Sequence, residues 1–241
     1  MAVGAGAKKV AMNHKIKALV FDAYGTLFDV HSVVARLEEL FPGRGQEVSR
    51  IWRTKQLEYT WLLSLMGGYE DFWEVTARSL AFACRALHLD CPPARQAHLL
   101  DAYLRLEAFP EVPRALMGLT AYPLAILSNG SPRMLDGVVE NAGLKGTFTQ
   151  VLSVDAVKIY KPSPRVYALA SQRLGLEAGA IGFVSANSWD IHGAGAFGFR
   201  TVWLNRTDQP GDELGFPPDI TVQSLTDLAK LLSRPNLNPS P

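Results

Sequence analysis

The segment LVFDAYGTLFDV, residues 19–30, is the most informative part of this sequence. Residues 16–21 form a short, nearly continuous apolar run, which is typical of a central parallel strand buried on both faces. The run ends in Asp22, and a Gly-Thr turn follows. The stretch therefore predicts an α/β fold that presents the carboxylate of Asp22 at the end of a strand. Tyr24 stands two places further on, so the chemistry must suit one aspartate with a tyrosine beside it.

Similar apolar runs recur along the chain, and helical patterns separate most of them. The runs are residues 124–129, 148–154, 181–186 and 201–205, and the helical patterns are residues 131–143, 163–175 and 190–198. Several of these patterns start with Ser, Asp or Pro and end near Gly, as helix caps do. Strand alternating with helix predicts an α/β fold with a doubly wound, Rossmann-like parallel sheet.

A long helical segment interrupts this alternation after the first strand. Residues 31–109 lack short β-branched runs, are rich in Leu, Ala, Glu, Arg and Trp, and show helical periodicity. An insert at this place lies over the carboxyl ends of the strands, where open α/β sheets bind ligands. We therefore expect an α/β core of residues 15–30 and 111–233, a helical cap domain of residues 31–110, and flexible tails of residues 1–14 and 234–241.

Composition narrows the class of protein. The chain has 241 residues, of which 48% are hydrophobic and 20% charged, as in an ordinary soluble globular enzyme. The net charge is +1 and no long Lys/Arg run occurs, which argues against nucleic acid or a membrane surface as a partner. No apolar run reaches the ~18 residues of a transmembrane helix. Cys84 and Cys91 show no metal or redox spacing, so we expect reduced thiols in a cytoplasmic protein.

Polar residues follow several of the predicted strands. The carboxyl ends of parallel strands meet at one edge of a sheet, so we expect these residues to share one crevice. They are Asp22, Tyr24 and Thr26 after the first strand, Ser128 to Gly130 after the second, Lys161 and Tyr167 around a helix start, and Ser185 to Asp190 after the fourth.

Together these segments resemble a known family. The motifs D-x-Y-G-T-L-F-D, SNGSP, YKP…VY and S-x-N-x-W-D, with the helical segment WRTKQLEYTW, are similar to those of the L-2-haloacid dehalogenases within the haloacid dehalogenase superfamily. The resemblance runs from about Ile16 to Leu232. It implies hydrolysis of short (S)-2-haloacids, such as 2-chloropropionate and haloacetate, to (R)-2-hydroxyacids and halide. It also implies a homodimer, formed through the cap helices.

The phosphatases of that superfamily differ at two positions. Their opening motif is DxDxT, in which the second Asp serves as acid and base and helps to hold Mg²⁺, and a late acidic motif supplies further ligands. Here the second Asp is Tyr24, whose reference pKa of ~10 makes it a poor proton donor at neutral pH. Ala186 stands where a metal-binding Asp would align. Asp22 and Asp190 are a thin ligand set for Mg²⁺, so we expect neither a metal nor another cofactor.

Displacement of a halide suits this set of residues. A carboxylate can attack a neutral carbon without a metal, so Asp22 would displace the halide from C2 and form an ester with inversion. Water would then attack the carboxyl carbon of Asp22. Asp190 is the candidate to activate that water, with Asn187 and Lys161 assisting, although an N-cap of the following helix is an alternative for Asp190.

The resemblance also suggests roles for the remaining residues. Leaving halide needs stabilisation, which it assigns to Arg53 of the cap with Asn129 nearby. We expect the substrate carboxylate to bind Ser128, Lys161 and the backbone near Ala23, Tyr24 and Asn129. We expect Thr26 to bond Asp22, Tyr167 to bond Lys161, and Ser185 to orient groups around Asp22. Tyr24, Leu57, Phe72 and Trp189 would form an apolar wall around the C2 substituent, whereas Trp52 and Trp61 read as ordinary packing.

Two other enzymatic readings compete with this one. An atypical superfamily phosphatase would require Mg²⁺-dependent release of phosphate, and Tyr24 and Ala186 argue against it. A hydrolase that opens a strained ring acid of the azetidine-2-carboxylate type would use the same ester route, so the attacking residues do not distinguish it. A binding module without activity predicts lost catalytic positions, and none is lost here.

Overall fold

A computed structural model describes residues 16–233, so both predicted tails, residues 1–14 and 234–241, lie outside the described residues. Strand β1 (Ala18–Phe21) lies in the middle of a parallel sheet, and all four of its side chains are buried. Residue Phe21 lies opposite Ile126 on one neighbouring strand and opposite Val184 on the other. The apolar run is continuous because helices cover both faces of the sheet.

The sheet has six strands in the order β3-β2-β1-β4-β5-β6, and every pairing is parallel. The doubly wound parallel sheet expected from the sequence is therefore confirmed. The other strands are β2 (Leu124–Ser128), β3 (Gln150–Ser153), β4 (Ile181–Ser185), β5 (Arg200–Leu204) and β6 (Ile220–Val222). The sequence pattern predicted five strands and missed β6, an edge strand of three residues with one exposed side chain, Thr221.

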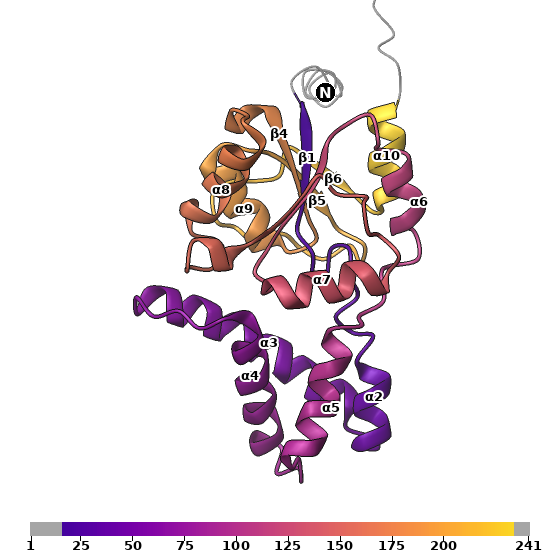
Figure 1. Cartoon of the computed structure of the whole chain (residues 1–241), viewed down its shortest axis with the longest axis vertical. Helices are drawn as coiled ribbons and strands as arrows, with labels where there is room; N and C mark the ends of the chain where they lie inside the picture. Colours follow the sequence, from indigo (N-terminus) through magenta and orange to yellow (C-terminus); the bar gives the residue numbers. More distant parts are fainter. Residues whose placement is uncertain (1–15, 234–241) are drawn as a thin grey trace, which may run out of the picture.

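Helices cover the two faces of the sheet. Helices α8 (Pro164–Leu174) and α9 (Ser188–Phe197) pack together on one face, and α6 (Val112–Met117) packs with α10 (Leu225–Ser233) on the other (Figure 1). Helix α7 (Pro132–Asn141) packs against β3. The 3-10 turns η1 (Val154–Ala156) and η2 (Ala178–Ala180) precede α8 and β4. Asn187 occupies the N-cap position of α9, so Asp190 lies inside its first turn and is not the cap.

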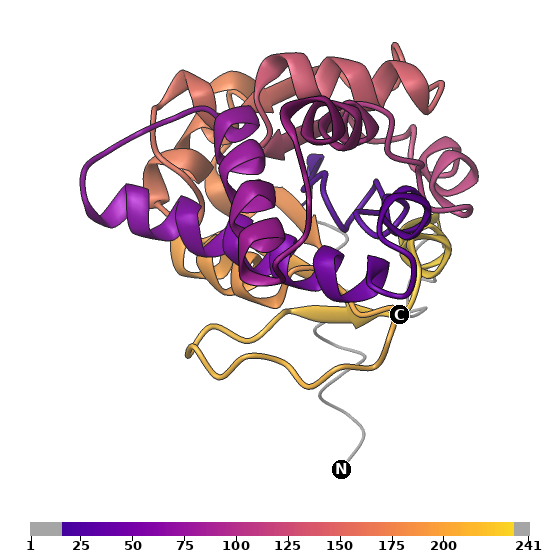
Figure 2. The same cartoon turned by 90° about the horizontal axis from the view of Figure 1, so that it is seen from below.

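A second group of helices lies at the carboxyl ends of the strands. It contains α2 (Val34–Leu40), α3 (Gly45–Leu65), α4 (Phe72–Ala86) and α5 (Pro93–Tyr103), which stand below the sheet in Figure 1 and in front of it in Figure 2. Helix α3 packs closely on α4 and α2. The side chain of Asp71 caps α4 by accepting a hydrogen bond from the N–H of Glu74 at 3.0 Å. This helical group therefore lies on the side of the sheet where the strands end.

The two connections between the helical group and the sheet run side by side. The N–H of Asp29 donates to the carbonyl of Glu107 at 2.8 Å, and the N–H of Phe109 donates to the carbonyl of Leu27 at 3.0 Å. An antiparallel bridge joins Phe28 to Ala108 between these bonds. The chain thus leaves and re-enters the α/β part through one short ladder, which fixes the helical group over the end of β1.

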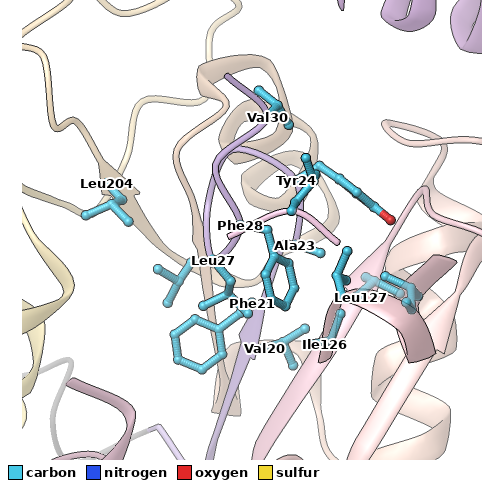
Figure 3. Close-up of a cluster of buried hydrophobic side chains, with 14 of the residues drawn as sticks. Val20, Phe21, Ala23, Tyr24, Leu27, Phe28, Val30, Ile126, Leu127 and Leu204 are labelled. Atoms are coloured by element: carbon cyan, nitrogen blue, oxygen red, sulfur yellow. The ribbon is translucent and has the colours of Figure 1, made fainter. Parts of the chain in front are cut away.

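The apolar core surrounds the end of β1. Val20, Phe21 and Leu27 are fully buried, and they lie near Ile126 and Leu127 of β2 in Figure 3. Burial of each such side chain is worth about 1.5–3 kcal/mol, so this cluster holds the loop after β1 rigidly. Among residues 16–233, none of the helices combines the length and the hydrophobicity that a membrane span requires.

Candidate active site

The carboxylate of Asp22 lies directly after β1 and receives four hydrogen bonds. Its Oδ2 accepts from Asn187 Nδ2 at 2.8 Å, from Thr26 Oγ1 at 3.0 Å and from Ser185 Oγ at 3.5 Å. Its Oδ1 accepts from Lys161 Nζ at 3.1 Å. The side chain is buried, with 5% of the residue exposed. One carboxylate oxygen is therefore held by three donors, while the other has one.

Thr26 is placed to donate to Asp22 and to no other acceptor. Its Oγ1 accepts a hydrogen bond from the backbone N–H of Ala186 at 2.9 Å, so its single proton is left for Asp22. The turn that brings Thr26 back requires Gly25, whose φ of 85° lies in the left-handed region. The Gly-Thr turn of the sequence thus produces the first donor of the site, as expected.

Lys161 joins the two carboxylates of the site. Its Nζ lies 3.1 Å from Asp22 Oδ1 and 2.7 Å from Asp190 Oδ2, and 1% of its side chain is exposed. Asn129 holds the backbone in place, because its Oδ1 accepts from the N–H of Lys161 at 3.1 Å. Burial lowers the pKa of Lys161, but the charges of Asp190 and Asp22 outweigh burial and raise the pKa above its ordinary value. The lysine therefore stays protonated.

Asp190 is fully buried in the first turn of α9. Burial raises the pKa of its carboxyl from 3.8 to about 6; Lys161 opposes this shift, and the nearby charge of Asp22 adds to it. Its Oδ1 accepts a hydrogen bond from the hydroxyl of Tyr167 at 2.7 Å. An aspartate with a pKa near 6 is ionised at neutral pH but is a stronger base than an ordinary aspartate.

The expected hydrogen bond between Tyr167 and Lys161 is wrong. The hydroxyl of Tyr167 donates to Asp190, and the ammonium of Lys161 is turned toward the two carboxylates. A carboxylate is a strong hydrogen-bond acceptor, whereas an ammonium group has donors only. The hydroxyl proton of Tyr167 can therefore go to Asp190 but not to Lys161. Burial and then the charge of Asp190 raise the pKa of Tyr167 well above its ordinary value, which keeps it a donor.

Ser128 and Asn129 stand at the end of β2, beside the loop that carries Asp22. The Oγ of Ser128 accepts a hydrogen bond from the N–H of Gly130 at 3.1 Å, so its proton remains for another acceptor. The Oδ1 of Asn129 is used by the backbone of Lys161, which leaves the amide nitrogen as its donor. Both residues are buried, and both can therefore offer a proton to an anion at this edge.

The four residues of the predicted apolar wall do not all lie together. The ring of Tyr24 lies 5.7 Å from that of Phe72. Leu57 lines a cavity of about 470 Å³ beside Arg53, and Trp189 lines another of about 500 Å³ together with Trp61. The rings of Trp189 and Trp61 meet edge to face at 5.5 Å, so Trp61 borders a cavity and is not merely packed.

Tyr24 presents a buried hydroxyl for which the described residues offer no hydrogen-bond partner. Figure 3 shows this hydroxyl at the far end of the ring, to the side of the apolar cluster. Burial, with a smaller effect of Tyr103, raises the pKa of Tyr24 far above its ordinary value, whereas the nearby charge of Arg53 lowers it. Tyr24 is therefore a neutral phenol and cannot act as an acid or base near neutral pH.

Arg53 lies on α3 and is held by a neighbour that the sequence analysis did not single out. Its Nη1 donates to Gln56 Oε1 at 2.7 Å, and no hydrogen bond joins it to Asp22 within residues 16–233. Gln56 is fully buried, and its Nε2 donates to Thr76 Oγ1 on α4 at 2.7 Å. The sequence shows that Gln56 follows Arg53 by three positions on one helical pattern, but the burial of Gln56 and its contact with Thr76 arise only from tertiary packing.

Arg206 is a second residue that the sequence analysis missed. Its guanidinium donates to the carbonyls of Gly25 at 3.2 Å and Thr26 at 2.8 Å. It also pairs with Glu111 at 2.8 Å and lies 3.7 Å from the ring centre of Phe109. One side chain thus joins the loop after β1 to the connection that returns from the helical group. No sequence motif marks it, because its partners are distant in the chain.

The acidic residues of the site do not form a ligand cluster. Within the described range 16–233, no group of three or more His, Cys, Asp or Glu side chains could hold a metal ion. Ala186, at the position of the expected metal-binding Asp, contributes its backbone N–H to Thr26. The cation that both carboxylates contact is the ammonium of Lys161.

Comparisons with known proteins agree with this geometry. The family model for haloacid dehalogenase-like hydrolases matches residues 16–198. The (S)-2-haloacid dehalogenase of Pseudomonas sp. (strain YL) is 55% identical over 218 residues, covering 90% of this chain and 94% of the relative. The haloacetate dehalogenase H-2 of Moraxella sp. (strain B) is 46% identical over 221 residues, covering 91% and 99%.

A solved structure carries the comparison to three dimensions. The L-2-haloacid dehalogenase from Xanthobacter autotrophicus with chloropropionic acid covalently bound is similar to this chain with a TM-score of 0.87 and 40% identity. The similarity covers 90% of this chain and 98% of that chain. The chain therefore belongs to the haloacid dehalogenase-like hydrolases and, within them, to the family of the L-2-haloacid dehalogenases.

Proposed function

We propose that this chain hydrolyses short (S)-2-haloalkanoic acids, such as 2-chloropropionate and haloacetate, to (R)-2-hydroxyacids and halide. The observation that carries the proposal is the carboxylate of Asp22, which is buried, held by four donors and paired with a lysine. The names of the relatives support the substrate class, and the covalently bound chloropropionic acid of the Xanthobacter enzyme supports an enzyme-bound ester. The same relatives favour this reaction over a phosphatase or a ring-opening hydrolase.

In the first half-reaction, Asp22 displaces the halide. Oδ1 is the attacking atom, because it has one hydrogen bond while three donors hold Oδ2. A bond forms between Oδ1 and C2, the carbon–halogen bond breaks, and the halide leaves with the electron pair. Attack from the side opposite the halide inverts C2. Lys161, through its contact with Asp190, stays near Oδ1 and orients the carboxylate without a metal.

In the second half-reaction, water attacks the carboxyl carbon of Asp22. Asp190 takes the proton of the water, since its carboxyl is ionised at neutral pH and its raised pKa makes it the stronger base. Negative charge develops on Oδ2, which already faces Thr26, Asn187 and Ser185. These donors act as an oxyanion hole, and the bond from the carboxyl carbon to Oδ1 then breaks. Asp190 returns its proton to Oδ1, which leaves as the hydroxyl oxygen of the product, and the new carboxyl group of Asp22 releases its proton to solvent to regenerate the carboxylate.

The remaining site residues bind the two anionic parts of the reactants. Ser128 and the backbone near Ala23 and Tyr24 take the substrate carboxylate, and Arg53 with Asn129 takes the leaving halide. The spare protons of Ser128 and Asn129 support this division. Tyr24 and Phe72, whose ring centres lie 5.7 Å apart, form the apolar wall that excludes water from the C2 substituent, whereas Leu57 and Trp189 line two other cavities.

The proposal is tested by incubation with each enantiomer of 2-chloropropionate in separate reactions. Chloride release and the chirality of the product are measured, with the Asp22→Asn variant as control. The expected result is chloride and (R)-lactate from the (S)-enantiomer and no chloride from the variant. Release of chloride from both enantiomers alike, or retention of configuration, would contradict the proposal.

We propose further that the protein acts in the cytoplasm, as a homodimer that joins through its cap helices. Free Cys84 and Cys91 are consistent with a reducing compartment. Leu62, Leu65 and Met66 expose large apolar side chains near the end of α3, which is typical of a subunit interface. Light scattering should give twice the chain mass, and Leu62→Lys should shift the protein toward a monomer. A monomeric wild type would exclude the dimer.

A further inference from the structure

Arg53 is held by a chain of hydrogen bonds that crosses between two helices of the cap. Its Nη1 donates to Gln56 Oε1, and Gln56 Nε2 donates to Thr76 Oγ1, both at 2.7 Å. Thr76 in turn donates to the carbonyl of Phe72 at 2.5 Å, and Trp52 Nε1 donates to the carbonyl of Thr76 at 2.8 Å. Gln56 and Thr76 are fully buried, so water does not compete for these bonds.

These hydrogen bonds can run in only one donor-to-acceptor direction. The proton of the Thr76 hydroxyl goes to the carbonyl of Phe72, so Oγ1 can only accept from Gln56. Gln56 must therefore turn its NH₂ group toward Thr76 and its carbonyl oxygen toward Arg53. This orientation fixes the guanidinium through one of its N–H groups and leaves the others for a ligand.

The partner of Arg53 is also neutral. Within residues 16–233, no carboxylate forms an ion pair with Arg53, whereas Lys55, on the same helix, pairs with Glu58 at 2.8 Å. A glutamate at position 56 could accept the same hydrogen bond but would cancel the positive charge. An amide holds the guanidinium and leaves its whole charge for an anion.

We propose that Gln56 is a positioning residue, which orients Arg53 and leaves its charge uncompensated so that it can bind the leaving halide. This inference rests on the proposed function, in which Arg53 takes the halide. Gln56 does not touch the substrate, and it acts only through Arg53. The choice of an amide at this position therefore contributes to turnover as well as to packing.

The test compares wild type with Gln56→Glu, which has nearly the same shape but adds a negative charge, and Gln56→Met, which removes both hydrogen bonds. For each protein, kcat and KM are measured with (S)-2-chloropropionate, and bromide is used as an inhibitor to obtain its inhibition constant. The Gln172→Glu variant is the control, because it makes the same chemical change at an exposed position on α8.

The expected result is a fall in kcat of roughly tenfold or more for Gln56→Glu, with a similar weakening of inhibition by bromide. Gln56→Met should lower kcat but weaken bromide inhibition less, because Arg53 keeps its charge. The midpoint of thermal unfolding is measured for all variants, since loss of stability alone would not change the affinity of the folded protein for bromide.

Arg53→Ala separates this inference from the proposed function. If Arg53→Ala impairs kcat and bromide inhibition while Gln56→Glu behaves like Gln172→Glu, the role of Gln56 is wrong and that of Arg53 stands. If Arg53→Ala leaves both quantities unchanged, the halide is held elsewhere, and the inference falls with the assignment on which it rests.

Discussion

At the scale of single residues, the site provides one ammonium group for two carboxylates. Lys161 contacts both Asp22 and Asp190, so the three groups together keep one negative charge when both acids are ionised. A net negative nucleophile can attack a neutral carbon, but it would repel a dianionic phosphoryl group. In the proposed reaction, other donors must then bind the halide and the substrate carboxylate, and among them Arg53 carries a full positive charge.

The first prediction concerns the Tyr24 hydroxyl, which is buried and unpaired among the described residues. Tyr24→Phe keeps the ring beside Phe72 and removes only this hydroxyl, so most of the wild-type kcat should remain. Because an unsatisfied buried polar group costs ~1–3 kcal/mol, the free energy of unfolding should rise by about 1 kcal/mol. Halide release and urea denaturation measure the two effects.

Tyr24→Asp is the matched contrast. It places a second carboxylate near Asp22, raises the cost of ionising the pair and admits water to the site, so halide release should fall far below that of Tyr24→Phe. An inactive Tyr24→Phe protein would mean that the hydroxyl takes part in the reaction, and the view of Tyr24 as an apolar wall would be wrong.

The pH dependence follows from Asp190. Its pKa is raised from 3.8 to about 6, and the proposed base must be ionised, so kcat should rise with pH through about 6 and level off above it. The raised pKa of Asp190 affects the stability of the fold in the opposite direction to kcat as the pH rises. A carboxyl that binds its proton more tightly in the folded state stabilises the fold below its unfolded pKa, and this contribution is lost as the pH rises through about 6. Such a group titrates over roughly pH 5 to pH 7, so a kcat that does not change across this range would exclude Asp190 as the base.

At the scale of elements, the site is made by loops that follow parallel strands and by one return connection from the helical group. The loop after β1 is held from inside by Thr26 and from outside by Arg206. Arg206 also holds Glu111 and Phe109, which lie where the chain re-enters the α/β part. Arg206 thus links the loop that carries Asp22 to the segment by which the chain returns from the helical group.

Removal of Arg206 should break this link and destabilise the fold. Arg206→Met leaves two backbone carbonyls and Glu111 without their donor, so the free energy of unfolding should fall by about 2–3 kcal/mol, and kcat should fall with it. Lys230→Met is the control, because Lys230 pairs with Asp227 on the exposed face of α10 and such a pair contributes about 0–1 kcal/mol. Equal stability of the two variants in urea denaturation would show that the contacts of Arg206 contribute little.

The strand-end residues of the site could be predicted from the sequence, but other parts of the site could not. The strand-end residues Asp22, Ser128 and Ser185 were predictable because each follows an apolar run whose pattern is local. Gln56 and Arg206 were not, since their partners Thr76 and Gly25 lie 20 and 181 positions away and only tertiary packing brings them together. The three residues of β6 carry too little pattern to predict a strand, and the acceptor of Tyr167 depends on where α8 crosses α9.

In the whole molecule, the α/β part carries Asp22 and Asp190, the proposed nucleophile and base, and the helical group carries Arg53 and Phe72. Two connections joined by a short ladder hold these halves together. The proposed reaction therefore uses residues of both parts and needs no bound metal, because Lys161 and Arg53 supply the positive charge.

Dialysis against EDTA tests this feature of the molecule. Chloride release from (S)-2-chloropropionate should be unchanged after dialysis and unchanged again when Mg²⁺ is added, since Tyr24 and Ala186 replace the acids that a magnesium site needs. Activity that disappears with EDTA and returns with Mg²⁺ would contradict the proposed mechanism.

A single turnover in H₂¹⁸O distinguishes an ester between Asp22 and the substrate from direct attack of water on C2. With enzyme in excess over (S)-2-chloropropionate, mass spectrometry locates the label in the product and in the peptide that contains Asp22. If water attacks the carboxyl carbon of Asp22, ¹⁸O should appear in the aspartate and the 2-hydroxyacid should be unlabelled. Label in the 2-hydroxyl group after that first turnover would contradict it, because water would then have attacked C2 itself.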